Sequence, residues 1–148
     1  MNGLNFDLTK IKIEEIRVVD ASISNPKGVS VLHDDEELIL DLTFDTGVSI
    51  KNNRIKANLK CDLKPSKSTD IVGSFNLSFI YHVENLSELV IMEEDLVKTI
   101  DSKLLECLSD TTYSTSRGII YSRCLGTIFK NVILPMTPSN TFVINMKD

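Results

Sequence analysis

The sequence has few cysteines, and they form no pattern typical of a disulfide framework or a zinc site. Its three cysteines are Cys61, Cys107 and Cys124, an odd number with no Cys-x-x-Cys pair. The first ten residues contain no apolar core like that of a secretory signal peptide. We therefore expect a protein of a reducing compartment, with the cytoplasm as its location.

Long apolar runs and concentrated positive charge are also missing. No stretch approaches the roughly 18 apolar residues that a membrane-spanning helix requires, so we expect no membrane insertion. The formal net charge is −5 with no basic stripe to offset it, which argues against nucleic acid as a partner. Hydrophobic residues make up 42% and charged residues 25%, as in a globular chain, and we expect a single domain over 1–148.

Motifs that carry catalysis or bind a metal or cofactor are absent from the sequence. It contains no phosphate-binding glycine loop and no His-Glu-x-x-His pair. Neither His33 nor His82 has a partner at metal-ligand spacing. The hydroxyl-rich run at 111–117 has no general base beside it, so capping and helix-surface roles fit it better. We predict no catalytic residue, no metal and no cofactor, and we expect a binding protein, not an enzyme.

Alternating apolar and polar residues dominate the first 85 positions and predict β-strands. The alternation is clearest over 37–50, 54–64 and 73–84 and is typical of antiparallel strands with one covered face. The opening segment, about 4–24, is also strand-like, but its phase slips, which indicates a β-bulge or a sharp bend. Two asparagines at 52–53 tolerate positive φ and predict a tight hairpin.

The apolar period changes after residue 93. Spacing of three and four residues predicts a helix over 93–108, with acidic residues in its first turn. Residues 109–110 interrupt this pattern, and Asp110 is suited to cap a second helix over 111–129.

The predicted fold class is α+β. We expect a four-stranded antiparallel β-meander, with its strands in sequential order, followed by one or two helices. The helices should pack on one face of the sheet, the face that bears Leu40, Leu59 and Leu77.

The second helical segment carries a small residue at every fourth position. Ser114, Gly118, Ser122 and Gly126 would form a shallow groove on one helix face, and Tyr121 belongs to the apolar residues that extend around the helix. A glycine inside a helix costs about 1 kcal/mol relative to alanine, and close approach of another body is the usual reason for it. The most economical body is a second copy of this helix. We therefore expect these five residues at an oligomer interface, with packing inside one chain as the alternative.

Two stretches of the sequence resemble the SecB export-chaperone family. The first is IEEIRVVDASISNP at 13–26, through Ile13, Ile16, Asp20, Ser22 and Pro26. The second is the helix and its exit, through Tyr113, Arg117, Gly126, Thr127, Leu134 and Pro135. With four strands followed by helix between them, the resemblance covers about 1–138.

The resemblance implies a molecular chaperone that holds unfolded client proteins for export or assembly. Members of the family assemble as a dimer of dimers with the long helices between two sheets, so a homodimer or homotetramer is implied. Their clients bind in apolar grooves between sheet, crossover loop and helices, and the loop here would be about 24–37. The client-binding residues we expect are Val29, Val31 and Leu32, with Tyr81 and Phe142 as aromatic walls.

The sequence departs from the family where members of the family dock the SecA translocation motor. Asp20 matches an acidic docking residue, but Ser24 replaces its neighbour, and Asn76 and Ser78 stand where the fourth strand would carry a glutamate. The twelve residues after Met136 leave no room for the family's full second helix. We therefore favour a stand-alone version that guards an antitoxin or one dedicated client. The expected partners are unfolded or precursor proteins, with SecA or an antitoxin as further candidates.

Two other function classes stay open at this point. The same sheet and helix could enclose a small molecule or a lipid. A thioesterase of the hot-dog type would need a carboxylate that faces a helix N-terminus at a subunit interface, and Glu84 or Asp110 could supply it. Binding of unfolded polypeptides compared with binding of acyl-CoA esters would separate these classes from a chaperone.

Overall fold

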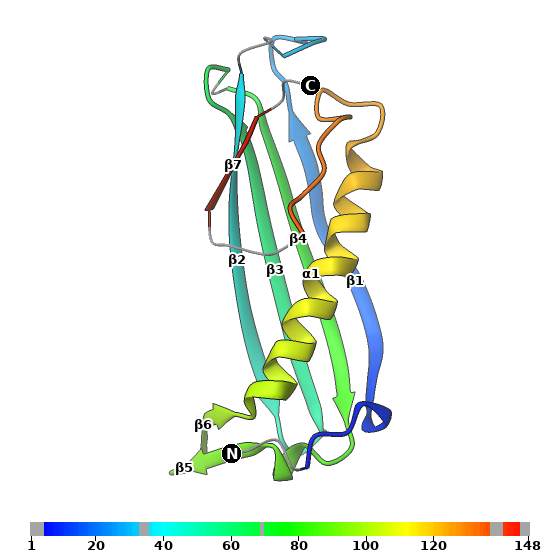
Figure 1. The fold of residues 1–148 in the computed structure, drawn as a ribbon, viewed down its shortest axis with the longest axis vertical. Coiled ribbons are helices and arrows are strands. Elements are labelled where there is room, and N and C mark those ends of the chain that lie inside the picture. The colour runs from blue at the N-terminus through cyan, green and yellow to red at the C-terminus, as the bar shows by residue number, and fades with distance from the viewer. Residues whose placement is uncertain (1–4, 33–35, 69, 137–140, 146–148) are drawn as a thin grey trace.

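The fold is an elongated antiparallel sheet crossed diagonally by one long helix (Figure 1). This computed structural model describes residues 5–32, 36–68, 70–136 and 141–145. The strands are β1 (Ile11–Ser24), β2 (Glu37–Ser49), β3 (Arg54–Pro65), β4 (Val72–Val83), β5 (Val90–Glu93), β6 (Leu96–Ile100) and β7 (Thr141–Asn145). The helices are α1 (Ser102–Cys124) and the short 3-10 helices η1 (Leu8–Lys10) and η2 (Leu86–Glu88).

The main sheet has the order β1-β4-β3-β2-β7, and each pair of neighbours is antiparallel. The predicted α+β class is confirmed, with four antiparallel strands followed by a helix, and β2, β3 and β4 form the expected meander. The predicted sequential order is wrong for β1, which pairs with β4 and not with β2. Short connections favour β2, β3 and β4 as neighbours, whereas the longer connection between β1 and β2 leaves β1 free to reach the far edge.

The details of the strand ends follow the local sequence. The turn between β2 and β3 places Asn53 at a φ of 53°, as its asparagine predicts. The pairing of β1 with β4 shifts twice, between Ile13 and Glu15 and between Val18 and Asp20, which confirms the predicted bulge. β1 begins at Ile11 and not near residue 4, because the Asp7 carboxylate accepts a hydrogen bond from the Thr9 N–H and caps η1.

One face of the sheet is buried beneath α1, as the alternation predicts. Leu40, Leu59 and Leu77 are between 0% and 3% exposed and belong to the same apolar core as the buried side chains of α1. Within this core the Tyr81 hydroxyl and the Thr112 Oγ1 lie 2.7 Å apart in a hydrogen bond that joins β4 to α1. Burying each such leucine stabilises the fold by about 1.5–3 kcal/mol.

The start of the helix differs from the sequence prediction. Residues 93–100, predicted as helix, lie in and around a hairpin of β5 and β6. Glu94 and Asp95 take φ values of 52° and 63° and turn the chain back on itself. The helix begins one residue after Asp101, whose carboxylate accepts hydrogen bonds from the N–H groups of Lys103 and Leu104 at 3.0 and 3.2 Å.

The rest of α1 is one continuous helix, not two. Asp110 lies exposed in its middle, so the predicted interruption and the predicted cap at this residue are wrong. The helix ends at Cys124, short of residue 129, because Leu125 takes an extended ψ of 135° and Gly126 a φ of 75°, which together turn the chain. Thr127 completes the ending, since its hydroxyl donates to the Cys124 carbonyl at 2.6 Å and accepts from the Phe129 N–H at 3.1 Å.

The chain after α1, residues 125–136, is called the exit segment below, and it completes the core. Its residues Phe129, Val132 and Leu134 are at most 3% exposed. Phe129 lies against Gly73 of β4, where an added Cβ would stand 3.1 Å from a ring carbon of Phe129. Glycine at this position therefore lets the exit segment approach the sheet.

Side chains of α1 hold the exit segment by its backbone. The Tyr113 hydroxyl donates to the Pro135 carbonyl at 2.6 Å, and the Arg117 Nε donates to the Leu134 carbonyl at 3.2 Å. With Gly126 and Thr127, these are the residues of the second stretch that resembles the SecB family. Their contacts fix how the chain leaves the helix.

Candidate functional site

The apolar side chains on one face of β2 are buried near the start of the strand and partly exposed further along it. Leu38 and Leu40 are 0% exposed, Leu42 is half-buried, and Phe44 is 37% exposed. Helix α1 packs mainly on β3 and β4, and its first turns pass the lower end of β2 (Figure 1). We call Glu37–Asp41 the upper half of β2 and Leu42–Ser49 its lower half. The lower half is an apolar face that the monomer covers only in part.

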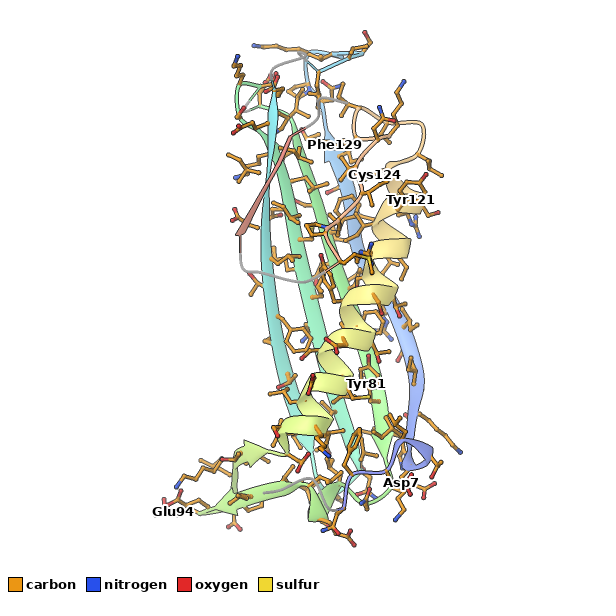
Figure 2. The ribbon with its side chains drawn as sticks, in the orientation of Figure 1. Asp7, Tyr81, Glu94, Tyr121, Cys124 and Phe129 are labelled. Carbon is orange, nitrogen blue, oxygen red and sulfur yellow. The ribbon has the colours of Figure 1, made fainter. Side chains whose placement is uncertain are left out.

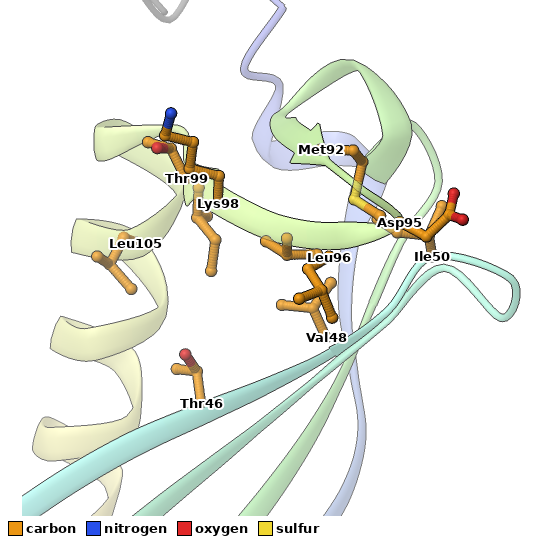
Figure 3. Close-up of a pocket in the computed structure, with 11 residues that line it drawn as sticks. Thr46, Val48, Ile50, Met92, Asp95, Leu96, Lys98, Thr99 and Leu105 are labelled. Atoms are coloured by element: carbon orange, nitrogen blue, oxygen red, sulfur yellow. The ribbon is translucent and has the colours of Figure 1, made fainter.

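A groove of about 660 Å³ lies beside the lower half of β2 (Figure 3). We call it the hairpin groove, because β2, the β5–β6 hairpin and the first turns of α1 form its walls. Leu96 and Val48 point toward one another from β6 and β2, and Leu105 points in from α1. The lining residues are Thr46, Val48, Ile50, Met92, Asp95, Leu96, Val97, Lys98, Thr99, Ile100 and Leu105.

The walls of the hairpin groove expose large apolar side chains to water. Leu96 is 73% exposed, and Met92 and Leu105 are 44% and 37% exposed. A gathering of such side chains in one hollow is typical of a binding surface. The rim is charged, with an ion pair of 2.6 Å between Lys98 and Glu93 and with Glu94 projecting from the hairpin tip (Figure 2). The groove is therefore suited to an apolar ligand that remains in contact with water at its ends.

The edge of β2 beside the groove has unpaired backbone. β7 pairs with the upper half of β2, from Glu37 to Asp41. On that side the lower half, Leu42–Ser49, pairs with no strand in the described part of the chain. Free N–H and C=O groups on a sheet edge accept an extended peptide as an added strand. Thr46 and Val48, which line the groove, belong to the eight-residue stretch that forms the open edge.

The crossover loop, residues 25–36, lies at the other end of β2 from the hairpin groove (Figure 1). Asn25 holds a turn in it, since its amide donates to the Val29 carbonyl at 2.7 Å and accepts from the Val29 N–H at 3.0 Å. Val31 is 73% exposed, whereas Val29 and Leu32 are half-buried against the core. Of the three loop residues expected to bind clients, Val31 is the one most open to a partner.

The two expected aromatic walls have different positions. Tyr81 is 1% exposed beneath α1 (Figure 2), and burial raises the pKa of its hydroxyl. It is a core residue, so we leave it out of the proposed client surface. Phe142 lies in β7, opposite Leu40 in the strand register, and its side chain lies outside the described part of the structure.

The small residues of α1 lie on its outer face. Ser114, Gly118 and Ser122 are exposed, and Tyr121 is 44% exposed. An added Cβ at Gly118 would have no heavy atom within 4 Å, so nothing in the described monomer requires a glycine there. Gly126 lies past the end of the helix, and its positive φ accounts for its glycine. The first three remain proposed interface residues, with Tyr121.

A second, smaller groove of about 360 Å³ runs along this outer face. It lies between α1 and the exit segment and is lined by Ser114, Arg117, Gly118, Tyr121, Ile133 and Leu134. Ile133 is 64% exposed, so the groove has an apolar rim. The small-residue face is thus a real hollow on the monomer surface.

The acidic residues singled out in the sequence lie apart from these grooves. Asp20 is exposed on β1, with the Ser22 hydroxyl 3.4 Å from its carboxylate, and its expected role in docking a motor stays a prediction. Glu84 and Asp110 are both exposed, and neither stands at the N-terminus of α1, where Asp101 is the cap. Asp110 therefore does not face the N-terminus of α1, as the thioesterase alternative would need it to do.

The two buried cysteines are not poised as nucleophiles. Burial raises the pKa of the Cys124 thiol to about 11 and that of Cys61 still further. Across the described residues, no group of three or more His, Cys, Asp or Glu side chains is arranged to hold a metal ion. Among the described helices, none combines the length and the apolarity needed to span a bilayer.

Comparison with known proteins gives a match of structure but not of sequence. No family model matches the chain, and no curated protein sequence matches it. The fold is similar to that of the SecB-like chaperone Rv1957 of Mycobacterium tuberculosis, solved in complex with a ChAD peptide from the Rv1956 HigA1 antitoxin. The two chains are 14% identical, with a TM-score of 0.51 over 88% of this chain and 91% of that one. This likeness shows that the chain has a SecB-like fold.

Proposed function

We propose that this protein is a chaperone that holds extended, apolar polypeptide segments along strand β2. The observation that carries the proposal is the coincidence of the hairpin groove with the unpaired lower half of β2. The groove supplies apolar contact, worth about 25 cal/mol for each Å² removed from water. The edge supplies backbone hydrogen bonds that do not depend on the sequence of the client.

A polypeptide fits this site better than a small molecule or a lipid does. Ligand pockets for small molecules bury most of the ligand in a concave cavity. Here the largest apolar contributor, Leu96, is 73% exposed, and the adjoining edge extends over eight residues of β2. A site that is long, apolar and open along one side favours an extended chain over a compact ligand.

Val31 of the crossover loop offers a second apolar contact at the far end of β2. A client that runs along the strand would reach from the hairpin groove toward this loop. A strand of thirteen residues spans about 40 Å at 3.3 Å per residue, so such a client segment would be of similar length. The fold neighbour was solved with an antitoxin peptide, which supports a polypeptide partner, and an antitoxin segment is one candidate client here.

We further propose that two copies of the chain meet through the outer face of α1. Ser114, Gly118 and Ser122 leave room for a second helix, and Tyr121 and Ile133 supply exposed apolar surface beside them. Small residues on a helix face let another helix approach closely, and symmetric dimers are the commonest soluble assemblies. The client edge of β2 stays free in this arrangement, because the face lies on α1 and not on β2.

The test compares two exposed leucines, Leu96 in β6 and Leu125 just after α1. Leu96→Ser removes the most exposed apolar side chain of the hairpin groove, and Leu125→Ser is the matched control, 53% exposed beyond the other end of the helix. The readout is suppression of aggregation of chemically unfolded citrate synthase, with client affinity measured by fluorescence anisotropy. We expect Leu96→Ser to weaken binding several-fold and Leu125→Ser to leave it unchanged. Wild-type protein that fails to slow aggregation at several-fold molar excess would overturn the chaperone proposal.

A further inference from the structure

The proposed client edge already carries one strand of the chain itself. β7, with the sequence Thr-Phe-Val-Ile-Asn, lies antiparallel along the upper half of β2 (Figure 1). We propose that β7 is a displaceable internal strand that competes with clients for the edge of β2 and thereby regulates access to it. This inference rests on the proposed function, because it concerns the same edge.

The position of β7 is the first reason for this inference. Its register runs from Thr141 opposite Asp41 to Asn145 opposite Glu37. It therefore occupies the five residues of β2 that lie between the open lower half and the crossover loop. A client pairing only with the lower half would lie end to end with β7, whereas a client reaching the loop must take its place.

The composition of β7 is the second reason. Phenylalanine, valine and isoleucine follow one another at its centre, and aromatic and β-branched residues are the types most favoured in strands. These are also the residue types that an apolar client segment would offer. β7 thus has the chemistry of a client, which is what a competing segment needs.

The size of β7 is the third reason. It pairs over five residues, whereas β2 offers thirteen and β1 pairs with β4 from Ile11 to Ser24. Each ordered residue loses conformational entropy, and a short edge strand gains few backbone hydrogen bonds in return. A longer client strand gains more from the same edge. This difference in gain is what lets a client that pairs with more of β2 compete with the tethered β7.

The position of β7 should change the apparent dissociation constant of clients. If the upper half of β2 is open in only a fraction of molecules, the apparent dissociation constant for a client that needs it rises by the inverse of that fraction. Holding β7 in place should exclude such clients. Releasing β7 should tighten their binding without any change in the hairpin groove.

The experiment locks β7 in the full-length chain. Ile39 and Val143 lie opposite one another in the register, and opposite residues on paired strands are close enough for a disulfide after modest adjustment. Ile39 alternates with the buried Leu38 and Leu40 and is itself half-buried, so Ile39→Cys leaves the core leucines in place. The double variant Ile39→Cys/Val143→Cys is compared in its oxidised form and after reduction with dithiothreitol. Ile39→Cys alone and Val143→Cys alone are the controls for the three native cysteines.

The probe is fluorescein-labelled, reduced and carboxymethylated α-lactalbumin, a permanently unfolded polypeptide. We expect at least ten-fold weaker binding to the oxidised double variant than to its reduced form, with no oxidant effect on either single variant. A second variant, Val143→Pro, removes a backbone N–H and disfavours strand pairing, so it should bind the probe several-fold more tightly than wild type.

The outcomes separate this inference from the proposed function. Equal binding by oxidised, reduced and Val143→Pro forms would show that β7 is a fixed part of the sheet, and the inference would be overturned while the chaperone proposal stands. Absence of binding by every form, wild type included, would overturn both. Hydrogen exchange gives a readout of displacement, since amides of 141–145 should lose protection when the probe binds, and retained protection would contradict the inference.

Discussion

The two halves of β2 have the same alternation of residues but different surroundings. In the upper half, Leu38 and Leu40 are fully buried, and the edge is paired with β7. In the lower half, Phe44 continues the same row but is 37% exposed, and the edge has no strand beside it in the described chain. Alternation therefore tells which face of a strand is apolar, whereas the packing of the rest of the chain decides where that face becomes core and where it stays available to a partner.

The strongest test of this comparison truncates one residue in each half. Leu40→Ala should lower the free energy of unfolding by about 2–5 kcal/mol, because the side chain is fully buried and a cavity replaces it. Phe44→Ala should cost less, about 1 kcal/mol, because its side chain is already partly in water. Urea unfolding followed by circular dichroism measures both.

Client binding should rank the same two variants in the opposite order. Phe44 lies two residues from Thr46 in the hairpin groove, on the same face of β2, so Phe44→Ala should weaken binding of unfolded polypeptide. Leu40→Ala should leave affinity unchanged under conditions where the variant stays folded. If Leu40→Ala impairs binding and Phe44→Ala does not, the lower half of β2 is not the client surface.

Helix α1 also has a covered face and an exposed face. Larger side chains on the exposed face test whether a second copy of the chain packs there. If a second copy packs against Ser114 and Gly118, leucine at either position should clash with it, at about 1–3 kcal/mol for each site. A symmetric dimer meets each clash twice. We expect Ser114→Leu and Gly118→Leu to lower the mass measured by light scattering, while circular dichroism shows a folded monomer. An unchanged mass would show that this face is open to water.

The spacing of small residues predicts Gly126 at the interface, but this position is unsuited to the test. Its φ of 75° is strained for any side chain, so a leucine there would destabilise the helix end whether or not a partner is present. Positions 114 and 118 carry no such conformational requirement. Substitutions at positions 114 and 118 can therefore report on assembly, whereas a substitution at Gly126 cannot.

The covered part of the sheet should also make the fold sensitive to alkali. Burial raises the pKa values of Cys61, Cys124, Tyr81 and Tyr113 in the folded state, so above about pH 9 the unfolded chain loses protons that the folded chain retains. Stability from these groups is complete below their unfolded pKa values and falls as pH rises toward their folded ones. The urea midpoint should therefore fall steadily from pH 9 to pH 11. A midpoint that is constant over this range would contradict the burial of these groups.

The sequence predicted the core of the sheet well because alternation is a local signal. The bounds of β2, β3 and β4 came within one residue, and the buried row of Leu40, Leu59 and Leu77 was identified. The partner of β1 could not be predicted, because its long connection to β2 carries no pairing signal. β7 was missed, although its run of aromatic and β-branched residues was a signal that could have found it.

The walls of the hairpin groove were missed for a different reason. The apolar residues Leu96, Val97 and Ile100 fit the spacing of a helix, and the whole region was predicted to continue into α1. Only the backbone shows that Glu94 and Asp95 form a turn, since neither residue type demands a positive φ. The site that best supports function is therefore built by the one segment whose local pattern was ambiguous.

The smallest expected effect is the change in stability when either of two glycines, one in α1 and one just after it, is replaced by alanine. Gly118 has no atom within 4 Å of an added Cβ, so Gly118→Ala should stabilise the monomer by about 1 kcal/mol through helix propensity alone. Gly126→Ala should destabilise it by about 1 kcal/mol, because alanine does not tolerate a φ of 75°. Urea midpoints at a protein concentration where light scattering shows monomer measure both changes. A loss of stability in Gly118→Ala would mean that another body approaches the helix backbone closely at this point. The described monomer places no such body there, so this result would contradict an open outer face of α1 in the monomer.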